Sequence, residues 1–524
     1  MLIGFQDQGN LGLGYLAAVL RQAGHQVLLR DVETDPDDIL RAVQDADPIL
    51  IGFSLIFQLY VDRLGALARH LRHHGITCHF TMGGHFPSLS YQHTLKLIPE
   101  LDSVVRFEGE VTLRELVDRL SAGRDWRDIQ GIAYPRDSTV VANPLRPLIV
   151  DLDELPYPAR DFPPEAVLGR SALPLLASRG CARTCSFCSI HTFYRTAPGK
   201  VVRTRKPQQV AEEMHALHQE RGVSIFLFQD DDFPLFGPVW RRWAMEFLEE
   251  LHRKNLPGRV IWKISCRADA VEHALFASLR QAGLYLVYLG LESGNEDGLR
   301  TLNKGVTVEQ NLRAVSTLKQ LDITCEFGFM LFDPSSTFQS VRANVEFLRT
   351  VLGDGSGAAV FGRMLPFDGT PIQAALQQAG RLRGDLRSPD YAFLDPRLDG
   401  FYAALTHLLQ LSGWFDGARG LAPQINWAWN EVAVMERLFP PLAGMVRYQQ
   451  QLRAITQAAN EWLFRMVEDL SYACSDGKPI AWSAEEPAAR CRELSDRLLK
   501  KRDGFVARRQ RELLRALDQP SPLT

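Results

Sequence analysis

The sequence predicts an α/β protein built in three parts. We expect an N-terminal doubly wound, Rossmann-like domain over residues 1–145, a linker over 146–170, a central partial (β/α)6 barrel over 171–375, and a mostly helical C-terminal domain over 376–524. Three observations predict this division. Short apolar runs alternate with amphipathic stretches in two separate series, a stretch rich in proline and carboxylates separates them, and apolar residues recur with a helical period in the last part.

Composition excludes several classes of protein. The net charge of −3 and the 23% of charged residues give no sign of a dedicated nucleic-acid binder. No apolar run reaches the roughly 20 residues of a membrane span, and residues 1–5 have no basic region before a long apolar one. Eight cysteines in 524 residues do not form a disulfide framework. We therefore expect a cytoplasmic protein in a reducing compartment, with no membrane span and no nucleic-acid partner.

The first series predicts a parallel sheet with helices on both faces. Its predicted strands are Leu2–Phe5, Gln26–Arg30, Pro48–Phe53, Thr77–Met82 and Ser103–Arg106. Its predicted helices are Leu11–Ala23, Asp37–Val43 and Val61–His74. In such sheets ligands bind outside the carboxyl ends of the strands, so the loops that follow the strands are the candidate site.

Those loops carry the informative residues. Gly83 and Gly84 directly follow a strand, where missing side chains let a ligand approach the backbone, although a tight turn is the alternative. Residues 9–14 read G-x-x-G-x-G rather than G-x-G-x-x-G, so a nicotinamide cofactor is not indicated. Histidines at one helix end and its following loop suggest solvated side chains more than a metal site; they are His70, His73, His74 and His79.

Together these loops resemble the cobalamin-binding domain attached to many radical S-adenosylmethionine enzymes. The resemblance covers about residues 1–145 and rests on residues 11–17, Gly52-Phe53-Ser54, Gly83-Gly84-His85 and Glu108-Gly109-Glu110. It implies that Ser54, Gly83 and Gly84 line the nucleotide tail, and that residues 6–11 and 55–58 face the corrin. The cobalamin contacts it implies are Gln6, Asn10, Leu11, Gly12, Ser54, Leu55, Gln58, Gly83, Gly84, His85, Glu108, Gly109 and Glu110.

A cobalt-binding histidine is not expected. The D-x-H-x-x-G motif that supplies this ligand in other cobalamin proteins is absent, and His85 has a different context. After a predicted hairpin at Ile129–Val141, residues 151–161 read D-L-D-E-L-P-Y-P-A-R-D, which is similar to a connection found in the same family. We expect this linker to pack between the domains.

The second series predicts a partial barrel with its reactive groups at the carboxyl ends of the strands. Its predicted strands are Leu173–Ala177, Ser224–Phe228, Val260–Ser265, Leu286–Gly290, Thr324–Leu331 and Gly357–Arg363. Its predicted helices are Pro207–Arg221, Pro238–Arg253, Ala270–Ala282, Val308–Leu321 and Thr337–Val351.

The most specific signal follows the first of these strands. Cys181, Cys185 and Cys188 are spaced C-x3-C-x2-C, and three thiolates can hold three irons of a [4Fe–4S] cluster while leaving the fourth iron open. The alternative is a zinc site, because His191 would complete a nominal Cys3His set. Zinc modules of this kind stand alone, whereas this loop caps a strand in a barrel-like series.

The cysteine spacing, with Phe187 before the last cysteine, resembles the signature of radical S-adenosylmethionine enzymes. The resemblance implies that S-adenosylmethionine binds the fourth iron and releases a 5′-deoxyadenosyl radical when it is cleaved. The S-adenosylmethionine contacts it implies are Phe187, Asp230, Asp231, Ser265, Arg267 and Glu292.

Individual roles follow from the same resemblance. Asp230 or Asp231 would bond the methionine amine, although the 230–232 carboxylates could also bind a metal or cap a helix. Arg267 would pair with the methionine carboxylate, with a surface ion pair as the alternative. Glu292 would bond the ribose hydroxyls, and residues 365–371 resemble the closing loop of the family.

The C-terminal part has no specific resemblance. Helices are predicted at Phe401–Leu411, Asn430–Phe439, Met445–Glu468 and Pro487–Leu517. Its five tryptophans, of nine in the chain, favour a helical core over the floor of a substrate cavity. We expect this part to cover the cofactor cleft and to set substrate choice.

The sequence therefore predicts a cobalamin-dependent radical S-adenosylmethionine enzyme, and most specifically a C-methyltransferase. Its expected cofactors are a [4Fe–4S] cluster, S-adenosylmethionine and cobalamin as methylcobalamin. Its expected partners are a small-molecule or peptide substrate and an electron donor such as flavodoxin or ferredoxin. The alternatives are oxidative cyclisation or ring contraction with the same cofactors, and a non-catalytic cobalamin or zinc sensor.

Overall fold

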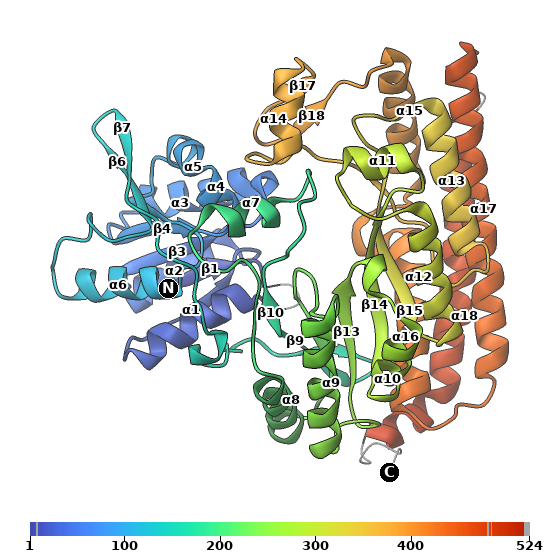
Figure 1. The fold of residues 1–524 in the computed structure, drawn as a ribbon, viewed down its shortest axis with the longest axis horizontal. Helices are drawn as coiled ribbons and strands as arrows, with labels where there is room; N and C mark the ends of the chain where they lie inside the picture. The colour runs from blue at the N-terminus through green and yellow to red at the C-terminus, as the bar shows by residue number, and fades with distance from the viewer. Residues whose placement is uncertain (7–8, 479–481, 484, 518–524) are drawn as a thin grey trace.

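The computed structural model describes residues 1–6, 9–478, 482–483 and 485–517. Its N-terminal domain and its C-terminal helices lie at opposite ends of the molecule, with the central sheet between them (Figure 1). None of the described helices is long and apolar enough to cross a membrane.

The N-terminal domain is a seven-stranded sheet in the order β2-β1-β3-β4-β5-β6-β7. The first five strands are parallel, and β6 and β7 continue the sheet as an antiparallel hairpin. Its strands are β1 (Leu2–Gly4), β2 (Leu29–Asp31), β3 (Leu50–Ser54), β4 (His79–Gly83), β5 (Ser103–Val105), β6 (Ile132–Arg136) and β7 (Thr139–Ala142). Its helices are α1 (Leu11–Gln22), α2 (Pro36–Ala46), η1 (Gln58–Tyr60), α3 (Val61–His73), α4 (His85–Leu89), α5 (Tyr91–Leu97) and α6 (Glu110–Ser121).

Two separate apolar cores cover the two faces of this sheet. Ile39, Leu64 and Phe86 from α2, α3 and α4 belong to one core, whereas Leu13 and Leu116 from α1 and α6 belong to the other. Along β3, Leu50 belongs to one core while Ile51 and Phe53 belong to the other, which confirms the doubly wound prediction. Helices α4 to α6 were not predicted.

His79 does not follow the expectation of a solvated side chain. It is buried, its ring lies 2.9 Å from the Ser103 hydroxyl, and it packs edge-on against Trp126. Burial lowers the pKa of His79 to about 4, so the ring stays neutral inside the domain.

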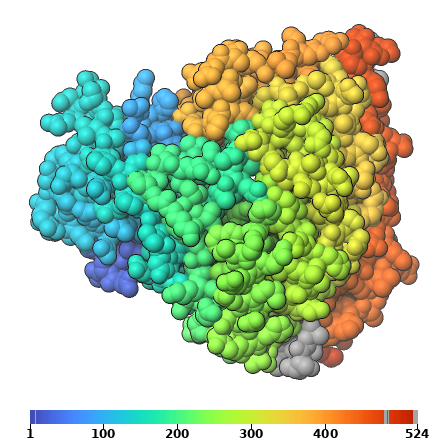
Figure 2. Space-filling model, viewed as in Figure 1, coloured from blue at the N-terminus to red at the C-terminus, as the bar shows by residue number. Residues whose placement is uncertain are grey.

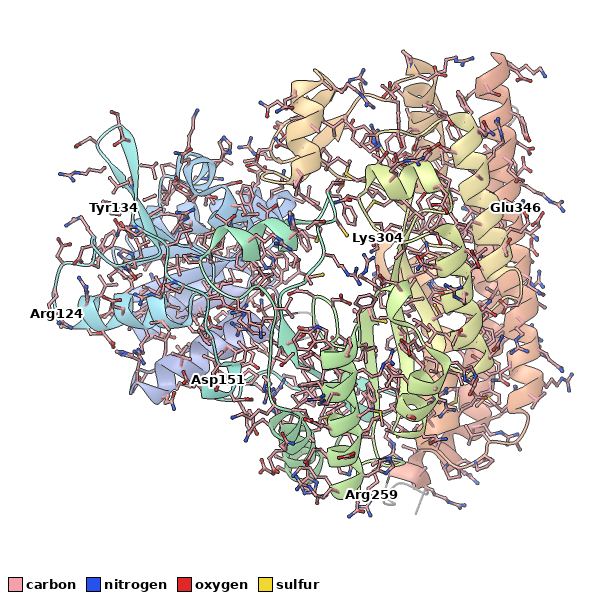
Figure 3. All side chains as sticks on the ribbon, in the orientation of Figure 1. Arg124, Tyr134, Asp151, Arg259, Lys304 and Glu346 are labelled. Carbon is pink, nitrogen blue, oxygen red and sulfur yellow. The ribbon has the colours of Figure 1, made fainter. Side chains whose placement is uncertain are left out.

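The linker packs between the domains, as predicted. The amide of Ala159 donates to the carbonyl of Gly14 at 2.9 Å, and a side chain on Gly14 would meet that turn at 2.7 Å. Arg160 pairs with Glu213 of the central domain at 2.7 Å. The linker contains η2 (Leu152–Glu154), which follows Asp151 at the lower edge of the N-terminal domain (Figure 3).

The central domain is a second seven-stranded sheet in the order β16-β15-β14-β13-β12-β9-β8. All neighbours are parallel except β8 and β9, and β16 and β8 are not paired to each other, so the barrel is partial. Its strands are β8 (Glu165–Val167), β9 (Arg170–Leu175), β12 (Val223–Phe228), β13 (Ile261–Cys266), β14 (Leu284–Glu292), β15 (Thr324–Phe332) and β16 (Gly362–Arg363), beside the short pair β10 (Ser178–Arg179) and β11 (Arg203–Thr204). Its helices are α7 (Ser189–Thr196), α8 (Pro207–Arg221), α9 (Pro238–Arg253), η3 (Ala268–Ala270), α10 (His273–Gln281), α11 (Glu296–Thr301), α12 (Val308–Gln320) and α13 (Phe338–Leu352).

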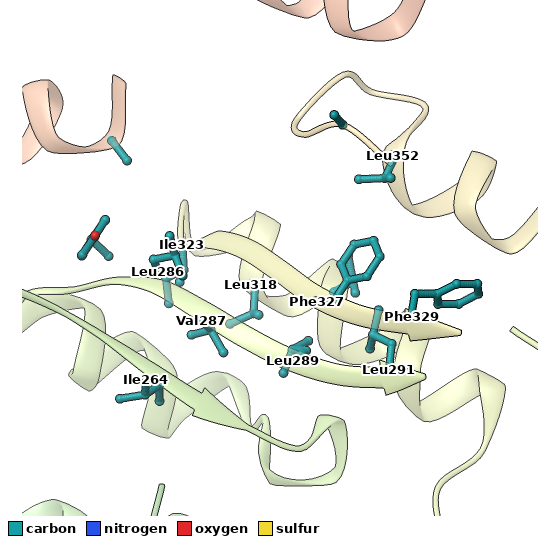
Figure 4. Packing of buried hydrophobic residues seen from close by; sticks show 14 of the residues in the cluster. Ile264, Leu286, Val287, Leu289, Leu291, Leu318, Ile323, Phe327, Phe329 and Leu352 are labelled. Atoms are coloured by element: carbon teal, nitrogen blue, oxygen red, sulfur yellow. The ribbon is translucent and has the colours of Figure 1, made fainter. Parts of the chain in front are cut away.

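Residue alternation gives this sheet two different faces. Val287, Leu289 and Leu291 of β14 point toward the covering helices and are fully buried (Figure 4). Tyr288, between two of them, is 39% exposed on the inner face of the partial barrel. The inner face is therefore accessible to a ligand.

The C-terminal helices share one continuous apolar core with the central sheet. α17 packs along α13, and Trp414 is fully buried, in line with the expected helical core. The elements here are α14 (Pro371–Gln378), β17 (Leu382–Gly384), β18 (Pro389–Tyr391), α15 (Pro396–Ser412), η4 (Gly417–Arg419), α16 (Leu421–Leu438), α17 (Met445–Asp476) and α18 (Glu485–Leu517).

Residues 365–391 reach back to the N-terminal domain over the top of the molecule (Figure 2). Gln58 donates to the carbonyl of Leu386 at 2.6 Å and accepts from the amide of Asp368 at 2.8 Å. Arg387 pairs with Asp62 at 2.6 Å. The N-terminal domain is thus held from two sides, by the linker and by this segment.

Candidate active site between the two α/β domains

A cavity of about 500 Å³ lies at the carboxyl ends of the N-terminal strands and is closed by residues of the central domain. Tyr15, Phe107, Phe193 and Tyr194 give it aromatic walls. Ten of the thirteen residues predicted as cobalamin contacts line it: Asn10, Leu11, Gly12, Ser54, Gly83, Gly84, His85, Glu108, Gly109 and Glu110.

The structure does not bring Gln6, Leu55 or Gln58 into this cavity. Gln58 is 2% exposed because its amide is bonded to the 365–391 segment, and the side chain of Leu55 belongs to the apolar core. Gln6 lines a smaller cavity beside the linker instead. Residues 7 and 8, within the predicted 6–11 loop, lie outside the described residues.

His85 contributes an aromatic wall to the cavity. Its ring packs edge-on against Phe193, with centroids 4.5 Å apart, and the surrounding protein lowers the pKa of His85 to about 4. The imidazole is therefore neutral at neutral pH.

Glu108 and Glu110 connect the two domains through a buried ionic network. Arg179, two residues before Cys181, pairs with Glu110 at 2.6 Å and with Glu108 at 3.2 Å. Arg203 donates to both oxygens of Glu108 at 2.8 Å. Both carboxylates line the cavity, but their charge is compensated by arginines that the motif-based prediction did not include.

The cysteine loop, residues 181–188, is held in place by backbone contacts. The amide of Ser186 donates to the carbonyl of Leu302, and the amide of Ile372 donates to the carbonyl of Ser186, both at 3.0 Å. Gly180 precedes the loop with φ of +85°, and a side chain there would lie 2.0 Å from the carbonyl oxygen of Val201. Only glycine fits this position.

The three thiols sit in different surroundings. Cys185 is buried with the guanidinium of Arg267 4.0 Å from its sulfur, and the sulfur of Cys181 lies 3.9 Å from a carboxylate oxygen of Asp232. Burial, with Asp232 adding to it, raises the pKa of Cys181 to about 12. The thiolate form would need a bound cation to stabilise it.

Among the described residues, no three His, Cys, Asp or Glu side chains converge as ligands of one ion would. A [4Fe–4S] cluster differs from a single-ion site, because each of its irons takes one thiolate.

The three carboxylates after β12 have different partners. Asp230 accepts from the hydroxyl of Ser178 at 2.5 Å and from the amide of Ala177 at 3.2 Å, so it braces the end of the preceding strand. Asp231 accepts from the amide of Gly180 at 2.9 Å and faces the large cavity. Of the three, Asp232 is the one in contact with a cysteine sulfur, although the predicted S-adenosylmethionine contacts do not include it.

Enclosure by the protein raises the pKa of all three groups, to about 7 for Asp230 and about 6 for Asp231 and Asp232. Arg267 and Lys304 partly offset the effect at Asp232. A cationic group of a ligand near these carboxylates would favour their charged forms.

The remaining predicted contacts gather at the strand ends around the cysteine loop. Arg267 is buried and paired with Asp269 at 3.0 Å, so it is not a surface ion pair. Glu292 pairs with the buried Lys304 at 2.9 Å, and Figure 3 places Lys304 near the centre of the molecule, facing the N-terminal domain. Ser265 and Phe187 are half-buried.

Glu292 adopts φ of +65°, a conformation unusual for a residue with a side chain. It lies where the register between β14 and β15 shifts, and this turns its carboxylate toward Lys304. Strain of this kind is commonly retained at functional sites.

Two family models match the chain, the B12 binding domain over residues 5–117 and the Radical SAM superfamily over residues 175–348. The uncharacterized methyltransferase PH0819 of Pyrococcus horikoshii is 30% identical over 368 residues, which cover 69% of this chain and 77% of that protein. The chain belongs to the cobalamin-binding radical S-adenosylmethionine enzymes.

Other members of this family carry different activities in their names. The chain is 30% identical to the anaerobic magnesium-protoporphyrin IX monomethyl ester cyclase of Rubrivivax gelatinosus, with 64% of this chain and 61% of that protein covered. It is 27% identical to the hopanoid C-3 methylase of Methylococcus capsulatus, with 62% and 61% covered.

Solved structures share the whole fold. The enzyme OxsB with aqua-cobalamin bound matches with a TM-score of 0.69 at 18% identity, covering 99% of this chain and 83% of that chain. The methyltransferase TsrM from Kitasatospora setae, with tryptophan and a SAM analog bound, matches with a TM-score of 0.66 at 18% identity, covering 96% and 99%.

The cofactors of this family of cobalamin-binding radical S-adenosylmethionine enzymes are a [4Fe–4S] cluster, S-adenosylmethionine and cobalamin, and the residues present fit them. Three thiols on one loop match the three protein ligands that such a cluster needs. The Gly83-Gly84 turn would give cobalamin a cradle free of side chains: Gly84 has φ of +112°, and a side chain there would lie 2.2 Å from the carbonyl oxygen of Leu55.

Replacing Gly84 by alanine is expected to lower cobalamin occupancy at least tenfold, because the added methyl group would collide with the Leu55 backbone and displace the Gly83-Gly84 turn that lines the cavity. Gly75→Ala is the matched control, since Gly75 also has positive φ, at +83°, but has no atom within 4 Å of the added methyl group. Absorbance of protein-bound hydroxocobalamin after gel filtration measures the effect. Equal occupancy in both variants would contradict the cradle.

Proposed function

We propose that the enzyme methylates an unactivated carbon of a small-molecule substrate. The observation that carries the proposal is the arrangement of two cofactor sites around one residue. Arg179 lines the cavity of the B12-binding domain and lies two residues from the first cluster cysteine. The relative PH0819 is named a methyltransferase, and of the relatives compared above it is the one that this chain covers to the largest share. This supports methyl transfer.

When bound, the cluster and S-adenosylmethionine supply a 5′-deoxyadenosyl radical, and methylcobalamin supplies a methyl group. The net reaction takes one substrate C–H bond, two S-adenosylmethionine molecules and two electrons. It yields the C–CH3 product, 5′-deoxyadenosine, methionine and S-adenosylhomocysteine. We propose an electron donor of the flavodoxin or ferredoxin class as the second partner.

The chain contributes binding, orientation and exclusion of water. We propose that Cys181, Cys185 and Cys188 hold the cluster, and that Arg267, Glu292 and the 230–232 carboxylates hold S-adenosylmethionine beside it. Burial of Arg267 and Glu292 supports this, because a charged group removed from water binds an opposite charge more strongly.

Each part of the chain has its own proposed role. Residues 1–145 would bind cobalamin, and residues 171–375 would bind the cluster and S-adenosylmethionine. Residues 146–170 would link these two domains. Residues 376–524 would shape the substrate site. The continuous core between the central sheet and the C-terminal helices supports a rigid wall for that site.

Product analysis tests the proposed reaction. The reconstituted holoenzyme is given a reductant and candidate substrates, and methyl transfer predicts 5′-deoxyadenosine together with S-adenosylhomocysteine and a product heavier by one CH2. Formation of 5′-deoxyadenosine with an unmethylated cyclised or contracted product would reject methylation in favour of the chemistry named for the cyclase relative. No cleavage of S-adenosylmethionine would reject both.

A further inference from the structure

The guanidinium of Arg267 lies against the sulfur of Cys185, with 4.0 Å between Nη1 and Sγ. Both residues are almost fully enclosed, since 5% of Arg267 and 7% of Cys185 is exposed. The contact joins the end of β13 to the cysteine loop, between residues that are 82 positions apart in the sequence. Because Cys185 is one of the proposed cluster ligands, a cation stands beside the proposed cluster site.

Other groups hold this guanidinium in one orientation. Asp269, two residues further along in η3, accepts from Nε at 3.0 Å and from Nη2 at 3.3 Å. The carbonyl of Gly305 also accepts from Nη2, at 3.4 Å. A planar fork bound along that side presents its remaining nitrogen, Nη1, in a fixed direction. Nη1 has the Cys185 sulfur as its partner among the described residues.

Asp269 also fastens the guanidinium to the cysteine loop. Its Oδ2 lies 3.0 Å from Nη2 of Arg183, which stands between Cys181 and Cys185 in the sequence. Arg267 and the loop are therefore paired with the same carboxylate. Only 10% of the Asp269 side chain is exposed, so these ion pairs are poorly screened by water. The contact between Arg267 and Cys185 is thus built into the fold rather than left to a free side chain.

A second cysteine of the loop has the opposite surroundings. A carboxylate oxygen of Asp232, which follows β12, lies 3.9 Å from the sulfur of Cys181. One proposed cluster ligand therefore faces a cation, and another faces a carboxylate. Charges and hydrogen bonds at the ligand sulfurs are among the factors that set the reduction potential of an iron–sulfur cluster.

The sign of each effect follows from the charge of the cluster. Reduction adds one electron to the oxidised [4Fe–4S]²⁺ core and gives [4Fe–4S]⁺, and the electron comes from the donor of the flavodoxin or ferredoxin class proposed above. Three thiolates outweigh the charge of the oxidised core, so the site is an anion before the electron arrives. A cation that donates to a ligand sulfur stabilises the reduced form more than the oxidised form, and a carboxylate does the reverse. Exclusion of water strengthens both effects.

We propose that Arg267 raises the reduction potential of the cluster through its contact with Cys185, and that Asp232 lowers it through Cys181. Arg267 is then a positioning residue that acts through a cluster ligand, in addition to the contact with S-adenosylmethionine proposed above. The inference rests on the proposed function in one respect, the placement of a [4Fe–4S] cluster on the cysteine loop. It is independent of methyl transfer.

A redox titration monitored by EPR tests this inference. The full chain is reconstituted with iron and sulfide and loaded with hydroxocobalamin, and titanium(III) citrate with viologen mediators sets the potential. No S-adenosylmethionine or substrate is added, so weaker binding of either cannot change the result. The signal of the reduced cluster is recorded at liquid-helium temperature, and the iron content of each protein is measured beside it.

Three variants and a control separate charge from geometry. Arg267→Met removes the cation but keeps a long side chain, whereas Arg267→Lys keeps the charge without the planar fork. Asp232→Asn removes the charge beside Cys181. Arg280→Met is the control, because Arg280 lies on α10 of the same domain and pairs with the exposed Asp322.

Arg267→Met is expected to lower the equilibrium constant for one-electron reduction at least tenfold, which lowers the midpoint potential by about 59 mV or more. Arg267→Lys should give a potential between those of Arg267→Met and the natural sequence. Asp232→Asn should raise the equilibrium constant at least threefold. Arg280→Met should leave it unchanged.

A midpoint potential of Arg267→Met equal to that of the natural sequence would overturn the inference. If Arg267→Met takes up no iron, the other two variants decide, and potentials of Arg267→Lys and Asp232→Asn that both equal the natural value would overturn it. A natural chain that forms no [4Fe–4S] cluster would reject the proposed function together with this inference. A normal cluster whose potential none of the variants alters would reject the inference alone, since product analysis still decides the reaction.

Discussion

Replacing Cys181, Cys185 and Cys188 together by alanine is expected to abolish 5′-deoxyadenosine formation, with a loss of at least about a thousandfold. The thiolates are the only protein ligands proposed for the cluster, and without the cluster no electron reaches S-adenosylmethionine. Iron content should fall to background, and the charge-transfer absorbance of the cluster should disappear.

The fold should survive this change. The loop is positioned by backbone bonds of Ser186 to Leu302 and Ile372, which the substitutions leave in place. Hydroxocobalamin binding should therefore remain within about twofold. Cys474→Ala is the matched control, because this half-buried thiol lies in α17, away from the loop. Cleavage retained by the triple variant would contradict the assignment of the loop.

Replacing Arg179 by methionine is expected to have the largest effect on stability. The change leaves the carboxylates of Glu108 and Glu110 in a buried site with one of their cations removed. Breaking a buried ion pair from one side typically costs about 3–5 kcal/mol. The expected result is a lower midpoint for the first unfolding transition in urea, together with loss of cobalamin, because both carboxylates line its cavity.

The double variant Arg179→Met with Glu110→Met tests the cause. Removing both members should recover a large part of the lost stability, because Arg203 still compensates Glu108 at 2.8 Å. Arg41→Met is the surface control: Arg41 pairs with Asp38 on the exposed side of α2, and little change is expected. An unfolding midpoint unaltered by Arg179→Met would show that the network does not join the domains.

Local patterns predicted many elements of the fold, although they did not predict α4 to α6. Helices α8 and α9 begin at Pro207 and Pro238 as predicted, because proline at the first helical position has the required φ and needs no hydrogen bond. The predicted strand at Gly357–Arg363 is shorter, since only Gly362 and Arg363 pair with β15. An apolar run cannot specify how much of it finds a partner at the edge of a sheet.

The sequence predicted where the residues of the candidate site lie along the strands, but not which groups their side chains contact. Asp230 and Asp231 were placed correctly at a strand end, yet Asp230 is bonded to Ser178 while Asp231 faces the cavity. Adjacent residues on a loop have no fixed alternation, so the sequence does not determine which carboxylate points where. Gln58 shows the same limit, because its partner Leu386 lies 328 residues away.

The sequence by itself determined the family, the two cofactor-binding parts and the cysteine loop. These depend on residue spacing along one short stretch and on the rule that parallel strands bring their carboxyl ends to one edge. Only the tertiary structure decided that Arg179 and Arg203 compensate Glu108 and Glu110, that Lys304 pairs with Glu292, and that Arg267 lies beside the sulfur of Cys185. The physical reason is that buried charges and cavity walls are completed by residues distant in the chain, whose proximity is set by packing of whole domains.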